Sequence, residues 1–370
     1  MANQELTSGD RHGPLAGLKV VEFAGLGPGP FACMLLSDLG ADVVTIAKPG
    51  TKAGDPANIT GRGRTVVIAD LKDSDAREDI YALLARADIL VEGFRPGVME
   101  RLGFGPDTLE AINPRLIYGR VTGWGQSGPL AQSAGHDINY IALAGALHAI
   151  GPANGPPVPP LNLVGDYGGG SLYLVCGILA ALHERQFSGR GQTIDAAIVD
   201  GTLSLMSTFL SFQLRGEINE QRGTNMLDGG APFYGVYETA DGKHVSVGAI
   251  EPQFFALLCE SVGVSESLRS GHHDRAAWPA LHEALRERFL QKSQAQWCDL
   301  LEGTDCCFAP VLSMSESGRH PHNEARHAMV NVDGVRHPAP APRFSRTPSI
   351  IQGPAPKTVT RLADVLGRWS

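Results

Sequence analysis

The sequence predicts an α/β fold in which a large doubly wound, Rossmann-like domain precedes a smaller α+β domain. Largely apolar strand patterns alternate with helical patterns through the first 120 residues, and a short hairpin pattern with further helices follows residue 223. Alternating strands and helices are typical of a parallel sheet covered by helices on both faces. At 370 residues the chain is long enough for two domains with ample hydrophobic core.

The first βαβ unit begins with a strand expected at 18–24, which leads through a Gly/Pro turn into an apolar helix at 31–39. The remaining strands of the large domain are expected at 42–47, 65–70, 89–92 and 116–121. Its other helices are expected at 75–87, 106–112, 138–147, 169–187 and 198–214. This order predicts a parallel sheet with crossover helices.

The composition changes after residue 223. Segments 234–238 and 244–248 alternate around Asp241-Gly242, a pair typical of a hairpin turn, and helices are expected at 253–262 and 278–292. A Pro-rich stretch at 338–348 is expected to return the chain to the large domain. The predicted boundaries are therefore a large domain over 1–200, a linker helix over 201–224, a small domain over 225–315 and a C-terminal return over 316–370.

Charge and cysteine usage restrict the class of protein. The net charge of −8 argues against a nucleic-acid binder, because there is no surplus of positive charge to release counterions. Six cysteines without C-x-x-C spacing indicate free thiols in a reducing compartment. The first 13 residues lack the apolar region of a secretory signal, and the longest apolar run, about 172–182, is too short to cross a bilayer. We therefore expect a cytoplasmic protein with neither nucleic-acid nor membrane partners.

The turn after the first expected strand, Gly25-Leu26-Gly27-Pro28-Gly29-Pro30, is similar to a dinucleotide-binding fingerprint. That fingerprint requires Gly or Ala where Pro30 stands, and an acidic residue near the end of the second strand, where Lys48 stands. The sequence therefore disfavours an NAD site. Close packing of the helix on the strand accounts for the glycines equally well, and the helix start remains able to receive an anion.

Six basic residues follow the first strands: Lys48, Arg62, Arg64, Lys72, Arg95 and Arg101. Each one alone fits a solvated surface charge. As a group in an acidic protein they favour phosphate binding, because guanidinium groups bind phosphate in a bidentate manner.

Proton-transfer chemistry is suggested by His136-Asp137 and by Asp166. An imidazole and a carboxylate on opposite faces of a carbon atom can remove a proton from one face and return one to the other. The same residues also fit helix starts, where Asp is a favoured N-cap. Glu251, which precedes Pro252, likewise suits the first turn of a helix. His320-x-His322 has few carboxylates nearby, so no metal site is expected.

Several segments resemble the family III CoA-transferase superfamily: 14–22, 27–30, 38–44, 135–140, 161–170, 225–232 and 247–254. The segments around His136, at 225–232 and around Glu251 resemble its α-methylacyl-CoA racemase branch. The resemblance implies an interlocked homodimer, an acyl-CoA thioester as substrate, and no cofactor besides the CoA that belongs to the substrate. It also implies that 2R- and 2S-2-methylacyl-CoA thioesters are interconverted by two-base proton transfer through an enolate.

The resemblance assigns roles to individual residues. His136 and Asp166 would be the two bases, Glu251 would orient His136 across the dimer interface, and the backbone N–H of Asp137 is expected to hold the thioester oxygen. The implied CoA-contacting positions are Lys48, Ala69, Asp70, Leu71, Lys72, Gly93, Phe94, Arg95, Arg101, Gly135, Ile138, Asn139 and Tyr140. Lys48 departs from the Arg usual in the family, which keeps the charge but loses the bidentate fork.

Two alternatives stay open at this point. A family III CoA-transferase would use Asp166 as a nucleophile and form a covalent anhydride. His136 and Glu251 argue against it, because that chemistry needs neither a second base nor an orienting acid. A noncatalytic acyl-CoA-binding protein would bind CoA without any exchange. The acyl groove of the racemase is expected to be lined by apolar residues, among them Met226 and Phe233.

Overall fold

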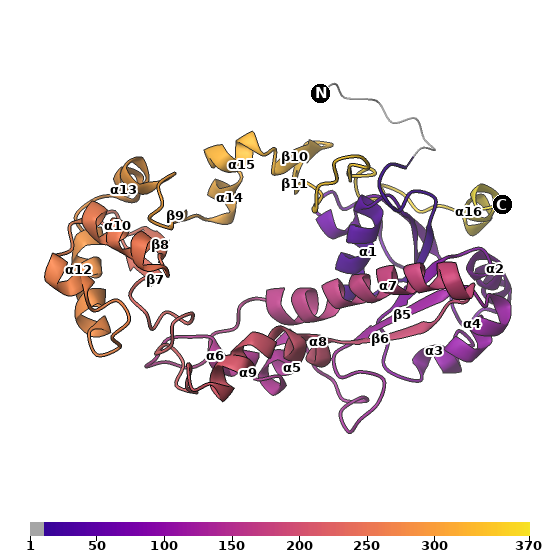
Figure 1. Ribbon diagram of the computed structural model, residues 1–370. Coiled ribbons are helices and arrows are strands. Elements are labelled where there is room, and N and C mark those ends of the chain that lie inside the picture. Colours follow the sequence, from indigo (N-terminus) through magenta and orange to yellow (C-terminus); the bar gives the residue numbers. More distant parts are fainter. Residues whose placement is uncertain (1–10) are drawn as a thin grey trace. The chain divides into compact units, whose positions relative to one another are not determined.

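The computed structural model of the chain describes residues 11–370, which form two compact units (Figure 1). The first unit contains the described residues up to 144 together with 161–205 and 325–370. The second contains 145–160 and 206–324. Each unit therefore draws on separate stretches of the chain.

A six-stranded parallel sheet forms the centre of the first unit. Its strands are β1 (Lys19–Phe23), β2 (Asp42–Ala47), β3 (Arg64–Ile68), β4 (Ile89–Glu92), β5 (Ile117–Thr122) and β6 (Thr193–Ala197). Their order is β3-β2-β1-β4-β5-β6, and every pairing is parallel. The predicted doubly wound fold is thereby confirmed. The strand order reverses between β1 and β4, and open α/β sheets bind ligands beyond the carboxyl ends of the strands at such a point.

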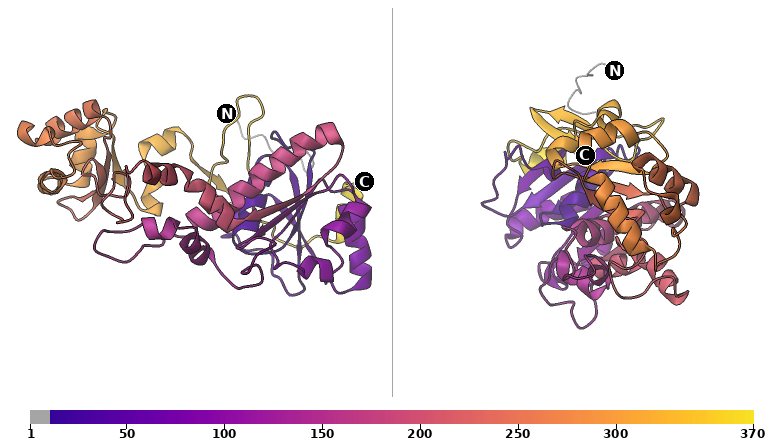
Figure 2. Two further views of the ribbon diagram at one scale, coloured as in Figure 1. Left: turned by 60° about the horizontal axis from the view of Figure 1, so that its bottom comes forward. Right: turned by 90° about the vertical axis from the view of Figure 1, so that its left-hand side faces the viewer.

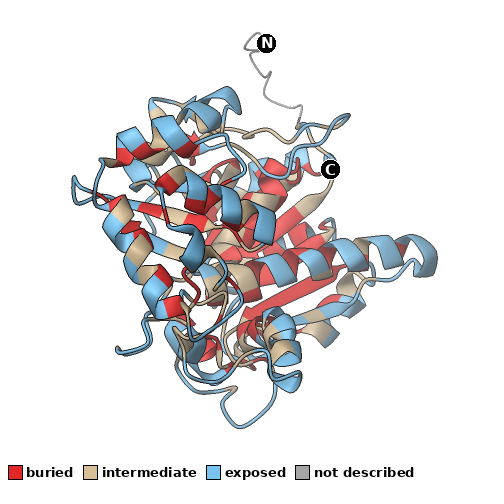
Figure 3. Cartoon of the chain, turned by 60° about the vertical axis from the view of Figure 1, so that its left-hand side comes forward, coloured by how far each residue is buried: buried red, intermediate tan, exposed pale blue. Residues whose placement is uncertain are grey.

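Helices cover both faces of this sheet because successive side chains of a strand point to opposite faces. Val21 and Leu90 belong to a core shared with α2 (Ser74–Leu84), α3 (Val98–Arg101), α4 (Pro106–Ile112) and α16 (Leu362–Arg368). Val20 and Ile89 belong to a second core, shared with α1 (Pro28–Asp38) and α7 (Tyr173–Ser188). Figure 2 shows α7 (pink) and the purple helices on opposite sides of the strands, and Figure 3 shows the buried interior in red.

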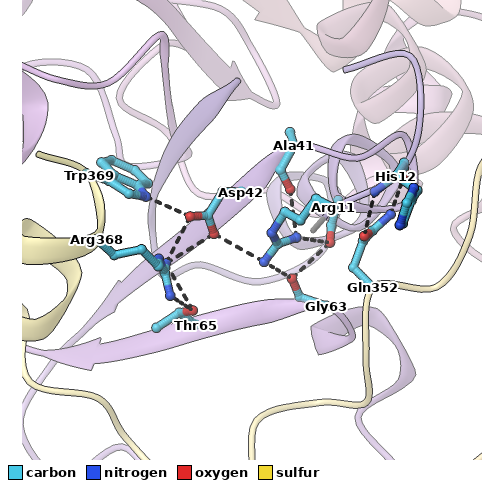
Figure 4. A network of polar contacts seen from close by, with 10 residues as sticks. Arg11, His12, Ala41, Asp42, Gly63, Thr65, Gln352, Arg368 and Trp369 are labelled. Carbon is cyan, nitrogen blue, oxygen red and sulfur yellow. Dashed lines mark hydrogen bonds and ion pairs between the residues drawn. The ribbon is translucent and has the colours of Figure 1, made fainter. Parts of the chain in front are cut away.

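The C-terminal helix is tied to the start of β2 by one carboxylate (Figure 4). Asp42 accepts a hydrogen bond from the indole N–H of Trp369 at 2.7 Å and forms ion pairs with Arg368 at 3.0 Å and Arg11 at 3.1 Å. Trp369 is buried, and its carbonyl accepts a hydrogen bond from Lys19 Nζ at 2.8 Å. The last residues are therefore part of the packed first unit.

The structure differs from the local predictions in three places between residues 137 and 214. The sixth strand, β6, was not predicted, since Ile194 is its one large apolar residue. The helix expected at 138–147 is split into α5 (Asp137–Leu143) and α6 (Ala146–Ala149), because Gly145 lies in the left-handed region. The helix expected at 198–214 is split into α8 (Ile198–Leu205) and α9 (Ser207–Leu214).

The helix expected at 169–187 begins earlier and changes character along its length. Residues Leu163–Leu172 form a π-helix, η2, which continues directly into α7. The joined segment has 26 residues, and an 18-residue window within it reaches a mean hydropathy of 1.3, so by length and composition alone it could cross a bilayer. Leu174 and Ile178 nevertheless lie buried against Gly119 of β5, as in a core helix.

In the second unit, β7 (Tyr234–Glu238), β8 (His244–Gly248) and β9 (Phe308–Val311) form an antiparallel sheet. The hairpin predicted around Asp241-Gly242 is confirmed, with Tyr234 opposite Gly248. The sheet packs with α10 (Pro252–Val262), α12 (Trp278–Phe289) and α13 (Gln294–Leu301) around Phe255, Phe289 and Trp297. Shorter helices are η1 (Ile59–Gly61) in the first unit, and α11 (Glu266–Arg269), α14 (Met314–Ser317) and α15 (Pro321–Ala325) further along the chain.

A second hairpin, which we did not predict, joins β10 (Met329–Val332) to β11 (Val335–Pro338). Its turn residues Asp333 and Gly334 both have positive φ, 50° and 84°. Positive φ at both central residues is characteristic of the tight turns that Asp-Gly favours. The dipeptide was therefore a signal that could have located this hairpin.

Candidate active site

His136 is the N-cap residue of α5 and holds the start of that helix with its main chain. Its backbone N–H donates to Asn139 Oδ1 at 3.0 Å, and its carbonyl accepts the N–H of Asn139 at 2.8 Å. Residue 136 has an extended conformation, with φ of −135°, and is exposed. The helix-start interpretation is thus correct for the main chain, and it leaves the imidazole at the surface of the unit.

Asp137 connects α5 to η2 through its side chain. Its Oδ1 accepts the backbone N–H of Asp166 at 2.7 Å. A Cβ at position 165 would lie 2.3 Å from Oδ1, so the contact requires glycine there. Burial raises the pKa of Asp137, and the backbone N–H groups of Asp166 and Gly165 oppose that effect.

Asp166 lies half-buried on the π-helix. The next residue, Tyr167, shows the π-helical hydrogen-bond pattern: its N–H donates to the carbonyl of Asn162, five residues earlier, at 3.3 Å. π-Helical turns occur frequently at functional sites. The Asp166 carboxylate accepts a hydrogen bond from Asn162 Nδ2 at 3.3 Å.

Burial is the main cause that raises the pKa of Asp166. The Asn162 hydrogen bond lowers this pKa, the negative charge of Asp137 raises it, and His136 lowers it. The last two effects show that both residues lie within electrostatic reach of Asp166. A raised pKa suits a carboxyl group that must both accept and return a proton near neutral pH.

The start of α1 faces the same carboxylate. A Cβ at Gly27 would lie 3.0 Å from Asp166 Oδ2, and Gly27 has a φ of 69°. Pro28 and Pro30 have no N–H, and the N–H of Phe31 already donates to the Gly27 carbonyl. The first turn of α1 therefore offers few donors to a phosphate and has a carboxylate beside it, in keeping with the sequence argument against a dinucleotide site.

Tyr140 packs against the segment that follows β5. Its hydroxyl donates to the carbonyl of Gly135, and its ring meets Trp124 edge-on with centroids 4.8 Å apart. A Cβ at Gly123 would come within 2.0 Å of the Tyr140 ring. Gly123 was not among the predicted site residues, although a glycine directly after a strand is a signal for close approach.

The predicted CoA-contacting residues follow the carboxyl ends of several neighbouring strands. Lys48 follows β2, Ala69 to Lys72 follow β3, Gly93 to Arg95 follow β4, and Arg101 ends α3. Gly135, Ile138, Asn139 and Tyr140 surround the start of α5. Lys48, Lys72, Arg95 and Arg101 are exposed, and none forms an ion pair with another residue between 11 and 370.

Two of the six basic residues do not belong to this exposed group. Arg62 pairs with Asp38 at 2.5 Å, and both side chains are 2% exposed. Arg64 pairs with Glu22 at 2.6 Å, also in the interior. The expectation that all six favour phosphate binding was therefore wrong for Arg62 and Arg64, because buried carboxylates already neutralise them.

An ion-pair network that we did not predict supports the loop after β4. Glu92 is buried at the end of β4 and accepts the N–H of Phe94 at 2.6 Å. Arg120 on β5 contacts Glu92 and Glu100, each at 2.8 Å. The network therefore fixes both ends of the loop that carries Arg95 and leads to Arg101. Sequence reasoning missed it because these three residues are distant in the sequence.

Glu251, Met226 and Phe233 lie in the second unit. Glu251 is exposed and is the residue before Pro252 at the start of α10, where its carbonyl accepts the N–H of Phe255 at 3.0 Å. Met226 is partly buried against the core of this unit. Phe233 is 1% exposed inside that core, so the expectation that it lines an open groove was wrong. His320 pairs with Glu302 at 2.7 Å.

Comparison with known proteins places the chain in a family. A sequence profile described as CoA-transferase family III matches residues 15–359. The chain belongs to this family. It is 46% identical to the α-methylacyl-CoA racemase of mouse and 44% identical to that of human, in each case over 91% of this chain and 88% of the relative. A crystal structure of a CAIB/BAIF family protein from Brucella suis, 26% identical, superposes with a TM-score of 0.83 and covers 97% of this chain and 100% of the other.

In this family III protein, Arg120 is expected to be essential for the stability of the loop after β4. Arg120→Met leaves Glu92 buried without a counter-charge, so we expect the free energy of unfolding to fall by about 3–5 kcal/mol. Urea denaturation followed by circular dichroism measures this change.

The matched control is Arg190→Met, because Arg190 pairs with Glu110 at 2.6 Å but both side chains are more than half exposed. An exposed pair contributes about 0–1 kcal/mol. Equal losses in the two variants would contradict the importance of the buried network.

Proposed function

We propose that the protein is an α-methylacyl-CoA racemase that interconverts 2R- and 2S-2-methylacyl-CoA thioesters. The observation that carries the proposal is that α5 and η2 bring His136 and Asp166 into one site, joined through Asp137. The names of the mouse and human relatives support the same reaction. An imidazole and a carboxyl group with a raised pKa are the two groups that a two-base proton transfer requires.

In the proposed reaction, His136 removes the α-proton of one epimer and Asp166 protonates the opposite face of the resulting enolate. The roles reverse for the other epimer. The α-proton of a thioester is far less acidic than either conjugate acid, so the enolate must be stabilised as it forms. The N–H of Asp137 is in the first turn of α5, where N–H groups have no partner within the helix. Donation to the thioester oxygen would contribute about 3–4 kcal/mol.

The CoA portion of the substrate would bind to the exposed bases beyond the strand ends. Lys48, Lys72, Arg95 and Arg101 supply positive charge there without a competing ion pair in residues 11–370. Phosphate groups bind such bases through charge-assisted hydrogen bonds. Lys48 would contribute a point charge rather than a bidentate contact.

The reaction needs no redox cofactor or metal in this proposal, because the proton that leaves one face is replaced on the other and the oxidation state of the substrate is unchanged. CoA takes part as a portion of the substrate. We place the enzyme in the cytoplasm, a location that the free cysteines suit.

We further propose that the enzyme is a homodimer, and that Glu251 of one subunit orients His136 of the other. Several large apolar side chains on η2, α7 and α8 are without cover in the single chain: Leu163 is 57% exposed, Leu172 53%, Phe187 78% and Leu203 45%. A partner subunit that covers these side chains would remove their apolar surface from water. The exposed carboxylate of Glu251 is available to bind an imidazole N–H.

Deuterium exchange distinguishes this function from its alternatives. One pure epimer of a 2-methylacyl-CoA is incubated with the wild-type protein in D₂O without any carboxylate acceptor. The racemase should incorporate α-deuterium and produce both epimers, and hydroxylamine should trap no acyl adduct. An adduct on Asp166 and no exchange would identify a CoA-transferase, whereas binding without exchange would identify a noncatalytic protein.

His136→Ala removes one of the two bases. We expect epimerisation to fall by about 10²–10⁴-fold, because general acid–base groups contribute that much to rate. The epimer that Asp166 deprotonates should still exchange its α-proton slowly with solvent and keep its configuration. Chiral chromatography with mass spectrometry measures both rates. Undiminished epimerisation in the variant contradicts the assignment of His136.

The homodimer predicts a sedimenting species of twice the chain mass. Phe187→Glu introduces a charge into the exposed apolar surface of α7 and should shift this species towards the monomer. Arg190→Glu, on an exposed loop, serves as the charge control. The measurement is analytical ultracentrifugation at micromolar concentration. A wild-type protein that sediments as a monomer would refute the dimer and the proposed role of Glu251.

A further inference from the structure

The side chain of Asp137 connects the two proposed bases. This contact is separate from the proposed role of the Asp137 backbone N–H in binding the thioester oxygen. The main chain of Asp137 follows His136 directly, and its side chain accepts the N–H of Asp166 at 2.7 Å. One peptide bond and one hydrogen bond therefore connect the residue that carries the imidazole to the residue that carries the carboxylate. A shift of either residue must strain this connection.

The carboxylate of Asp137 is also withdrawn from solvent. The residue is 7% exposed, and its Oδ2 is buried with no hydrogen-bond partner among residues 11–370. Buried polar atoms are normally hydrogen-bonded, so an exception calls for a reason. Among residues 11–370 no donor meets this second oxygen, and the negative charge of the Asp137 carboxylate acts on Asp166.

We propose that Asp137 is a positioning residue of the two-base reaction, whose carboxylate fixes the main chain of Asp166 relative to His136 and places a negative charge beside it. This inference rests on the proposed racemase function. A like charge nearby disfavours ionisation of a carboxyl group and so favours its protonated form. Asp166 must be protonated whenever it acts as the acid, so the arrangement serves the reaction directly.

Few other charges act on Asp166. Burial raises its pKa, the negative charge of Asp137 raises it further, and Asn162 and His136 lower it. Tyr140 on α5 lies within electrostatic reach of Asp166 and of Arg95. The first turn of α1, which faces Asp166 at Gly27, contains no ionisable side chain. Asp200 on α8, the helix packed against η2, is exposed, and Asp137 is the anionic side chain whose charge raises the Asp166 pKa.

The reaction makes this effect measurable in a pH profile. The active free enzyme carries one proton on the His136–Asp166 pair, so kcat/KM falls at low pH when both groups are protonated and at high pH when neither is. These limbs report the macroscopic pKa values of the pair. Both epimers must show the same limbs, because the equilibrium constant fixes the ratio of the two kcat/KM values.

The decisive variant is Asp137→Asn, which keeps an oxygen acceptor for the Asp166 N–H but removes the charge. Its acidic limb should move to lower pH for both epimers, since ionisation of Asp166 becomes easier. Asp137→Ala also removes the tether, and misplacement of a catalytic group by about 1 Å can reduce kcat by about 10²-fold. We expect KM to change little, because the phosphate contacts are elsewhere.

Gly165→Ala tests the Asp137–Asp166 hydrogen bond from the side of η2. The new Cβ would lie 2.3 Å from Asp137 Oδ1 and would therefore push this oxygen away. It should lower kcat as Asp137→Ala does. The matched control is Asp195→Asn, because Asp195 accepts the N–H of Gln126 at 2.9 Å but contacts neither proposed base. This variant should leave both limbs unmoved.

The outcomes separate two kinds of failure. If the wild-type enzyme does not exchange deuterium, the racemase proposal fails and the role of Asp137 fails with it. If the wild type exchanges but Asp137→Asn keeps the wild-type acidic limb, only the inference about Asp137 is overturned. A uniform loss of rate at every pH, with unmoved limbs and a lowered melting temperature, would assign Asp137 a structural role alone and would also overturn it.

Discussion

The parallel pairing of β1 with β2 on one side and with β4 on the other is the constraint on which the rest of the first unit depends. Parallel strands end at the same edge of a sheet, and crossover helices must lie on its faces. The loops after β1, β2, β3, β4 and β5 therefore meet at one edge. Every proposed site residue of the first unit lies in or just beyond these loops, or on α5 and η2.

Buried ion pairs determine which of the basic residues remain available at that edge. Arg62, Arg64 and Arg120 are each paired with a carboxylate in the interior, and Arg120 supports the loop that precedes Arg101. Removing one partner of such a pair leaves an uncompensated buried charge, which is costly. These three arginines therefore stabilise the fold. The exposed bases Lys48, Lys72, Arg95 and Arg101 remain available for an anionic ligand.

Glycine allows the elements around Asp166 to approach closely. A Cβ at Gly201 of α8 would lie 1.9 Å from the carbonyl of Gly169 on η2, and Gly27 and Gly165 make similar room for the carboxylates of Asp166 and Asp137. The single O–H of Ser171 is shared between the carbonyls of Pro28, at 2.7 Å, and Asp166, at 3.1 Å, and so ties η2 to α1. The backbone of Asp166 is therefore held at its N–H by Asp137 and at its carbonyl by Ser171.

The sequence by itself determined the fold class, most strands of the parallel sheet, the β7–β8 hairpin and the family, because apolar periodicity and turn residues are local signals. It also located His136 and Asp166. Only the tertiary structure decided that Arg62 and Arg64 are neutralised inside, that Phe233 is core, that Asp166 lies on a π-helix and that Asp137 binds its main chain. Burial and pairing depend on residues far apart in the sequence, so a single local pattern does not contain them.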